Sequence, residues 1–294
     1  MADGPIHISS AIPFEFELVA VPGDLTDLVN TFFVARADDG DIDEMLPAYS
    51  AQLMVYVEGR SDLRPEGGEV FQSDRVTCTA PLLSAAPFTL KGPATIVGAS
   101  LTPLGWHCLA QLPADKVNNC VVPAARVLAE DEIVLLEQLA DACRSGSSEP
   151  QAIVDAISEA LRSRAARLDP GHVRFVKQVI GWLSSALNPS LETLYSDLSV
   201  SKRTAQRLCR RYFGVSPSHL VKRYRAIRAA MLLANRDLPD AMRDEIVSAY
   251  FDQAHLIRDI RRYTGRTPGA LRGDSLVQDT LDPDAHGAAA RILR

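Results

Sequence analysis

One eight-residue pattern occurs twice in the C-terminal third of this chain. Arg210–Pro217 and Arg261–Pro268 both read Arg-Arg-Tyr-x-Gly-x-Ser/Thr-Pro, and the copies start 51 residues apart. In each copy a basic helical stretch ends, Gly supplies the left-handed residue that caps it, and Ser-Pro or Thr-Pro opens another helix. The repeat therefore predicts one short helical unit used twice, and units of this kind are typical of a helix-turn-helix.

The helix that ends in the first copy has two chemically different faces. Its apolar side chains recur at helical spacing as one inward stripe: Ala205, Leu208, Cys209 and Tyr212. Ser201 is placed to cap its start. The outward side chains that suit guanine and adenine edges are Arg203, Gln206 and Arg207, and the cations that suit phosphates are Lys202, Arg210 and Arg211. One such helix is equally typical of a solvated basic surface, so the second copy is what favours nucleic acid.

The second copy closes a helix of the same design. Asp252 is placed to cap it, and Leu256, Ile260 and Tyr263 form its inward side. Its more exposed side chains are Ala254, Arg258, Arg261 and Arg262, and Gln253 and His255 lie in its first turn. A lone histidine such as His255 is more often a packing or surface residue than a group that reads bases.

A long helix is predicted between the two copies. Its apolar residues recur every three or four positions from about Ser218 to Asn235: Leu220, Tyr224, Ile227, Met231 and Ala234. Eighteen helical residues span ~27 Å, enough to hold two small units apart as a rigid strut. Two recognition helices on such a strut would enter successive major grooves, ~34 Å apart on one face of the duplex.

Residues 172–272 resemble the DNA-binding domain of the AraC/XylS family of bacterial transcription regulators. The matching positions are Ser190, Leu191, Glu192, Leu194, Leu198, Ser201, Arg203, Gln206, Arg207, Gly214, Ser216, Pro217, Arg225, Arg228, Asp252, Gln253, Ala254, His255, Arg258, Gly265 and Pro268. The resemblance implies that Arg203, Gln206 and Arg207 read bases from the first unit. It implies that Gln253, Ala254, His255 and Arg258 approach the bases from the second unit. We also expect phosphate contacts from Arg261 and Arg262.

Both units depart from the family pattern, and the second departs further. Ser199 and Ala249 stand where the family usually has Gly at the turn before each recognition helix, and in the second unit the polar run 243–245 stands where small apolar residues are expected. Met242, Ile246, Ala249 and Tyr250 still make an apolar face in a shifted register. We therefore expect the second unit to bind DNA less strictly than the first.

The charge distribution separates the chain into an acidic and a basic part. Residues 172–272 hold 18 Lys and Arg against 8 Asp and Glu, a net charge of +10, whereas residues 1–171 carry −14 and residues 273–294 carry −2. The whole-chain charge of −6 thus hides a basic module that can neutralise phosphates.

The N-terminal half is predicted to be mainly β-structure. Short apolar runs alternate with Gly and Pro, which predicts strands at Gln52–Val57, Val70–Phe71, Val76–Pro81, Phe88–Leu90 and Thr95–Leu101. From Glu130 to Leu168 the period becomes helical and predicts a hairpin, one helix packing on the β-structure and the other forming a homodimer.

The predicted fold is therefore α+β, with a β-barrel or sandwich-like domain and a helical hairpin before an all-α domain of two helix-turn-helix units joined by a long helix. The predicted domains are a sensory or dimerisation domain at 1–168 (β-rich to about 122, hairpin at 130–168), a DNA-binding domain at 172–272 and a mobile tail at 273–294.

Candidates for ligand chemistry are few. Tyr56, Phe88, Trp106 and His107 are the side chains that would line a small-molecule pocket, although aromatic residues in a barrel are more often core. Only His7 and His107 lie in the N-terminal domain, so neither a metal centre nor another cofactor is expected. Five cysteines without paired spacing are typical of a reduced, cytoplasmic protein.

Two function classes fit this sequence. The first is a sequence-specific transcription regulator that binds double-stranded DNA and is modulated through its N-terminal domain. Its further partners would be a small-molecule effector, a second copy of the chain and, for an activator, RNA polymerase; no leader or long apolar run suggests a membrane. The alternative is a DNA-targeted alkyl-transfer repair enzyme with a nucleophilic Cys, although none of the five cysteines lies in a recognisable motif of that kind.

Overall fold

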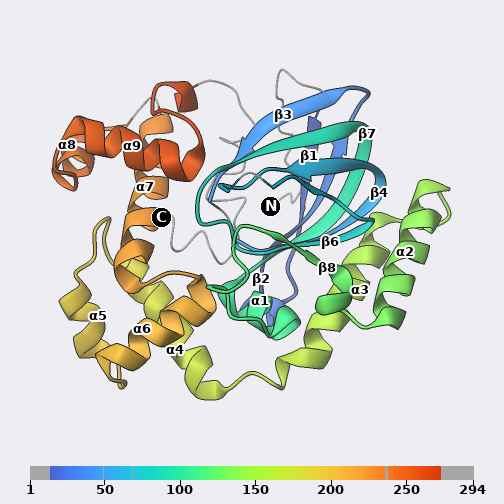
Figure 1. The fold of residues 1–294 in the computed structure, drawn as a ribbon, viewed down its shortest axis with the longest axis horizontal. Coiled ribbons are helices and arrows are strands. Elements are labelled where there is room, and N and C mark those ends of the chain that lie inside the picture. The colour runs from blue at the N-terminus through green and yellow to red at the C-terminus, as the bar shows by residue number, and fades with distance from the viewer. Residues whose placement is uncertain (1–13, 49, 68, 236–237, 273–294) are drawn as a thin grey trace.

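The computed structural model describes residues 14–272, apart from residues 49, 68, 236 and 237. An antiparallel sheet with three helices comes first and a helical domain follows; Figure 1 shows α4 to α9 to the left of and below the sheet, and α2 and α3 at its lower right. This order confirms the predicted α+β class. His7 and the predicted tail at 273–294 lie outside the described residues. No helix among the described residues is long and apolar enough to cross a membrane.

The N-terminal domain is built on one curled, eight-stranded sheet. Its strands are β1 (Phe14–Val19), β2 (Val29–Ala37), β3 (Asp41–Leu46), β4 (Gln52–Leu63), β5 (Phe71–Gln72), β6 (Val76–Thr79), β7 (Ala86–Leu101) and β8 (Val121–Pro123). The order is β1-β2-β7-β4-β6-β8, with β3 also paired to β7 and β5 to β4, and every pair is antiparallel. Strand β4 shifts register twice around Gly59, whose φ of 76° and tight approach to Ala94 exclude a side chain.

Two sequence predictions about the strands are corrected. The runs Phe88–Leu90 and Thr95–Leu101 belong to one strand, β7, because Pro93 lies where the strand changes partner and needs no N–H there. Residues 86–91 pair with β3 and residues 94–101 with β2. Strands β1, β2, β3 and β8 were not predicted; β2 is buried on both faces and therefore lacks polar alternation.

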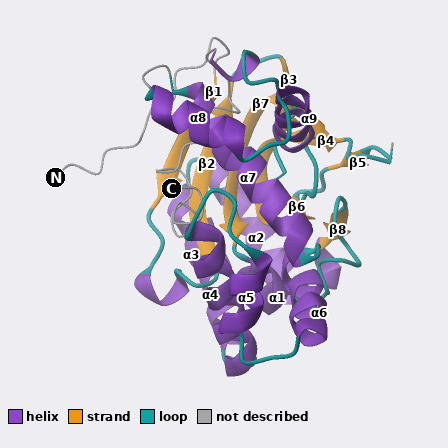
Figure 2. Ribbon diagram, turned by 90° about the vertical axis from the view of Figure 1, so that its left-hand side faces the viewer, coloured by secondary structure: helices purple, strands orange, loops and turns teal. Residues whose placement is uncertain are grey.

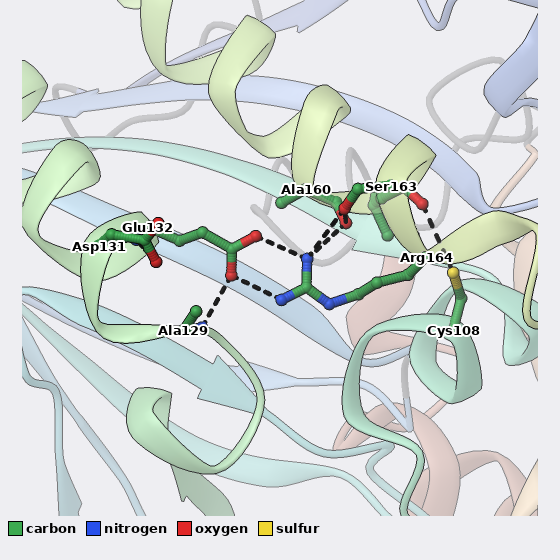
Figure 3. Close-up of polar contacts among 8 residues, drawn as sticks. Cys108, Ala129, Asp131, Glu132, Ala160, Ser163 and Arg164 are labelled. Carbon is green, nitrogen blue, oxygen red and sulfur yellow. Dashed lines mark hydrogen bonds and ion pairs between the residues drawn. The ribbon is translucent and has the colours of Figure 1, made fainter.

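The predicted helical hairpin is present as α2 (Glu130–Arg144) and α3 (Pro150–Ala165). Figure 3 shows that Arg164 of α3 donates both Nη groups to the Glu132 carboxylate of α2, each at 2.6 Å. Glu132 also accepts from the backbone N–H of Ala129 at 2.8 Å. The side chains of Ile153, Ile157 and Leu161 bury α3 against the sheet and α1 (Pro103–Ala110), which sequence analysis did not predict.

Helix α2 is the outer member of the hairpin. Its fully buried side chains are Leu136 and Ala140 alone, whereas Val134 and Leu135 are 44% and 47% exposed. Both helices of the hairpin contact the sheet, α2 through β4 and β6 and α3 through β7, so packing is not confined to one helix as predicted; α2 also has an exposed apolar edge.

The helical domain contains α4 (Pro170–Ser184), α5 (Leu191–Asp197), α6 (Lys202–Phe213), α7 (Pro217–Ala234), α8 (Asp240–Ser248) and α9 (Gln253–Thr264). The long helix predicted at 218–235 is confirmed as α7. Figure 2 shows the group α4, α5 and α6 at one end of the molecule and α8 and α9 at the other, with α7 running between them. The helical domain thus consists of two small groups of helices joined by one rod.

The apolar core does not stop at the predicted domain boundary. One buried cluster continues from the sheet through α1 and α3 into α4 and α6, and includes Phe32, Trp106, Phe175 and Tyr212. A second cluster holds α7, α8 and α9 together around Ile246 and Ile260. The first helical group is therefore fused to the β-domain core, and the second group has a core of its own.

Candidate nucleic-acid interface

The helix α6 is fixed at both ends by its own sequence. The Ser201 hydroxyl accepts a hydrogen bond from the Thr204 N–H at 3.2 Å, and Gly214 (φ 78°) donates its N–H to the Arg210 carbonyl at 3.0 Å. The predicted inward stripe is buried, Gln206 is half-buried, and the exposed cations are Lys202, Arg203, Arg207 and Arg210. The helix therefore presents one cationic face to solvent.

The helix α9 repeats this design. The Asp252 carboxylate accepts from the His255 N–H at 2.6 Å, and Gly265 (φ 75°) donates to the Arg261 carbonyl at 2.9 Å. Its exposed residues are Gln253, Ala254, Arg258, Arg261 and Arg262. Both copies of the octapeptide thus end equivalent helices with the same cap, as the sequence predicts.

His255 is the predicted base-reading residue that is turned partly inward. Its Nε2 lies 3.2 Å from the Asp259 carboxylate, one turn along α9, and its ring meets the Tyr250 ring edge-on. Only a third of the side chain is exposed. These contacts give His255 a packing role within the unit.

Two buried arginines of α7 join the helical groups. Arg225 donates to the Ala249 carbonyl at 3.0 Å and to the Asp259 carboxylate at 3.3 Å, both in the second group, and to the Asn188 side chain at 3.4 Å in the first. Its guanidinium also lies 4.2 Å from the centre of the Tyr250 ring. Arg228 donates to the Ala186 carbonyl at 2.9 Å. Buried charges need such partners. Two Arg on an otherwise apolar helix face are therefore the feature of the sequence that indicates these buried contacts.

Arg211 faces the β-domain and lies away from the cationic face of α6. Its Nη2 lies 3.4 Å from Nε2 of His107 on α1, and its carbonyl accepts from the Ala114 N–H at 2.8 Å. The equivalent carbonyl in the second unit, that of Arg262, accepts from the Ala85 N–H at 2.9 Å. The β-domain therefore contacts both repeats at the same position.

The sequence of this region matches one family model, described as a helix-turn-helix domain, over residues 194–274. Residues 194–274 are an AraC-type helix-turn-helix domain. The chain is accordingly a DNA-binding transcription regulator.

Solved structures give a more distant likeness to the chain that carries this AraC-type domain. ToxT from Vibrio cholerae superposes with a TM-score of 0.44 at 8% identity, over 88% of this chain and 98% of ToxT. The AraC-like transcriptional activator CuxR superposes with a TM-score of 0.33 at 17% identity, over 74% of this chain and 81% of CuxR. No curated protein matches the sequence.

The four residues predicted to line a ligand pocket do not come together. Tyr56 is buried in the curl of the sheet and its hydroxyl hydrogen-bonds to Ser61, whereas Trp106 is fully buried on α1 in the other core cluster. Phe88 borders a cavity of only about 10 Å³, roughly the room for one water, and Tyr56 borders a separate, open one of about 240 Å³ beside Ser73 and Arg75. His107 lies between the two domains, against Arg211 and Tyr212 of the AraC-type domain. Burial first, and then the Arg211 charge, lower the pKa of His107 to about 4.

The cysteine thiols are held in their neutral form. Burial raises the pKa of Cys78 and of Cys209 to about 12 and that of Cys108 to about 11, and it also raises those of Cys120 and Cys143. Within residues 14–272, apart from the four undescribed positions, no three His, Cys, Asp or Glu side chains are grouped so that they would hold a metal ion.

Proposed function

We propose that the chain reads a specific duplex sequence by placing α6 and α9 in successive major grooves. The observation that supports this proposal is the pair of equivalent, identically capped helices with cationic outward faces, fixed to one rod by buried Arg225. Helix α7 has 18 residues, which corresponds to ~27 Å; α6 leads into its start, and α9 packs against its second half. We propose that a rod of this length sets the two recognition helices for successive grooves, which lie ~34 Å apart on one face of DNA.

We assign base contacts to the exposed or half-exposed side chains of the first turns. In the first unit these are Arg203, Gln206 and Arg207, and in the second they are Gln253, Ala254 and Arg258. Phosphate contacts fall to Lys202, Arg210, Arg261 and Arg262. His255 and Arg211 are left out of this proposal, because His255 is held by Asp259 and Arg211 by the β-domain.

The β-domain is proposed to modulate this binding. Its backbone donates hydrogen bonds to the carbonyls of Arg211 and Arg262, and its Glu44 forms an ion pair with Arg266. A change in the conformation of the β-domain would therefore act on both units. A small-molecule effector would act through this domain, and RNA polymerase would be a partner if the regulator is an activator. The open edge of α2, with Val134 and Leu135, is the surface we propose for a homodimer.

The alkyl-transfer alternative receives no support from the thiols. A nucleophilic Cys needs a stabilised thiolate, whereas burial raises the pKa of all five cysteines. Transfer of a methyl group from alkylated DNA to any of these cysteines would restore that alternative.

The direct test is selection of binding sites from a randomised duplex pool, followed by affinities on single-base variants of the selected site. Arg207→Ala should lose ~1 to 3 kcal/mol at one base pair and relax the preference there. Arg210→Ala, three residues further along the same helix, should weaken all variants alike. Failure of the wild-type protein to enrich any sequence would refute sequence-specific binding.

A further inference from the structure

Phe251 is the most exposed large apolar side chain among the described residues. Its exposed fraction is 93%, compared with 53% for Val247 and 37% for Met242 on the preceding helix. An aromatic ring left almost wholly in water is unusual, because burying it elsewhere would be favourable. The position of Phe251 therefore calls for a partner.

The loop between α8 and α9 holds this ring outward. Tyr250, the preceding residue, is buried beneath the Arg225 guanidinium, and Asp252, the following residue, caps α9 through the His255 N–H. Residues 250–252 form a bend in which Tyr250 is held inward and Asp252 is held at the start of α9, and the Phe251 side chain between them lies in solvent.

The surroundings of Phe251 match a nucleic acid better than a protein. On the α9 side it is followed by exposed Gln253 and Ala254 and then by exposed Arg258. The outer face of α8 instead carries exposed Asp240, Asp244 and Glu245, which would repel phosphates. A duplex would therefore approach from the α9 side. Phe251 lies just before the N-terminus of α9, the end of a recognition helix that contacts base edges in the groove.

We propose that Phe251 selects a thymine in the second half-site by packing its ring against the 5-methyl group. Phe and Ala are both side chains that contact this methyl group in the major groove, and Ala254 lies three residues further on. This inference rests on the proposed function, and it gives the second unit a base preference that its polar residues alone would not supply.

The test uses the full-length chain and duplex sites selected by the wild-type protein. Each thymine of the second half-site is replaced singly by deoxyuridine, which removes only the methyl group. One replacement should weaken wild-type binding about fourfold, the value for burying one methyl group. The variant Phe251→Ala should bind the thymine site about as weakly as the wild type binds the deoxyuridine site, and it should not respond to that replacement.

Two variants control this experiment. Val247→Ala removes another exposed apolar side chain, from α8, and should retain the full response to deoxyuridine. Phe251→Leu keeps an apolar side chain and should retain part of it. Because Phe251 is exposed, its variants should keep the wild-type unfolding midpoint, so a change in affinity would not reflect misfolding.

Three results would overturn the proposal. The first is an equal response of wild type and Phe251→Ala at every thymine. The second is a selected half-site in which no thymine responds. The third is unchanged DNA binding by Phe251→Ala together with reduced transcription in a reconstituted reaction, which would identify the ring as a contact for a protein. Loss of selective binding by the wild-type protein itself would instead refute the underlying function.

Discussion

Replacing Arg210 and, separately, its neighbour Arg211 by Ala should have different effects on the salt dependence of DNA binding. The two residues are adjacent in sequence, but Arg210 is exposed on the cationic face of α6, whereas Arg211 lies against His107 of the β-domain. Each phosphate neutralised by a cation releases counterions, so the slope of log K against log salt counts the cations that contact phosphates.

The structure gives the expected size of this effect. Four exposed cations are assigned to phosphates: Lys202, Arg210, Arg261 and Arg262. At about −0.9 per contact the wild-type slope is about −3.6, so a rise from ~50 to ~200 mM salt lowers the affinity roughly 150-fold. Without Arg210 the slope becomes about −2.7, and the same rise costs roughly 40-fold. With Arg211 replaced, the wild-type slope should remain.

The assay is fluorescence anisotropy of a labelled selected duplex at five or more salt concentrations. Arg211→Ala removes a contact with His107 at the domain junction, and this loss can change the affinity at every salt concentration by the same factor. Such a change would shift the plot of log K against log salt without altering its slope. A slope reduced by ~0.9 in Arg211→Ala would show that Arg211 does contact a phosphate, and that the domains rearrange on DNA. A flat response of the wild-type protein would refute DNA binding altogether.

Three further predictions concern the second unit, the rod and the domain junction. Randomising the half-site under α6 should abolish specific binding, while randomising the half-site under α9 should cost about tenfold or less, ~1.4 kcal/mol. Equal losses would show that the second unit reads bases as strictly as the first despite the polar run 243–245. Arg225→Ala should lower the free energy of unfolding by ~3 kcal/mol or more, because it leaves the Asp259 carboxylate and the Ala249 carbonyl without this donor, and Arg225→Lys should not restore it. In urea unfolding the exposed Lys222→Ala, on the same helix, should match the wild type, and equal stability of Arg225→Ala would contradict the proposed link. Because the folded pKa of His107 is lowered to about 4, stability should fall as the pH drops from about 6.5 toward 4, where the unfolded chain binds the proton first; His107→Gln should reduce that dependence in thermal unfolding, and an unchanged pH profile would assign it to other groups.

Local chemistry explains why much of the C-terminal half was predictable from sequence. Gly214 and Gly265 are both left-handed caps, and Ser201 and Asp252 both accept the N–H three residues ahead, as their spacing indicates. These interactions lie within four residues of each other, so they are encoded in a short window of sequence. The long helix and the inward stripe of α6 follow from periodicity in the same way.

The shifted apolar face of α8 in the second unit was predicted only in part from the sequence. The predicted shifted face of α8 buries Ile246 and Tyr250, but Met242 remains 37% exposed. The helix forms because its local pattern allows it. How much of its face is covered depends on neighbours distant in sequence, which the pattern does not contain.

Only the tertiary structure decided which side of each element meets a partner. Arg210 and Arg211 read as one basic pair in sequence, and they are separated because the β-domain places Ala114 and His107 against Arg211 alone. Trp106 and His107 are adjacent on α1, yet one lies in the sheet core and the other at the domain junction. The amino-acid sequence by itself determined the helices, their caps and the repeated cationic face, because those depend on residues a few positions apart. The partners of Arg211, His255 and the aromatic residues of the β-domain depend on contacts across the fold, and only the packed chain specifies them.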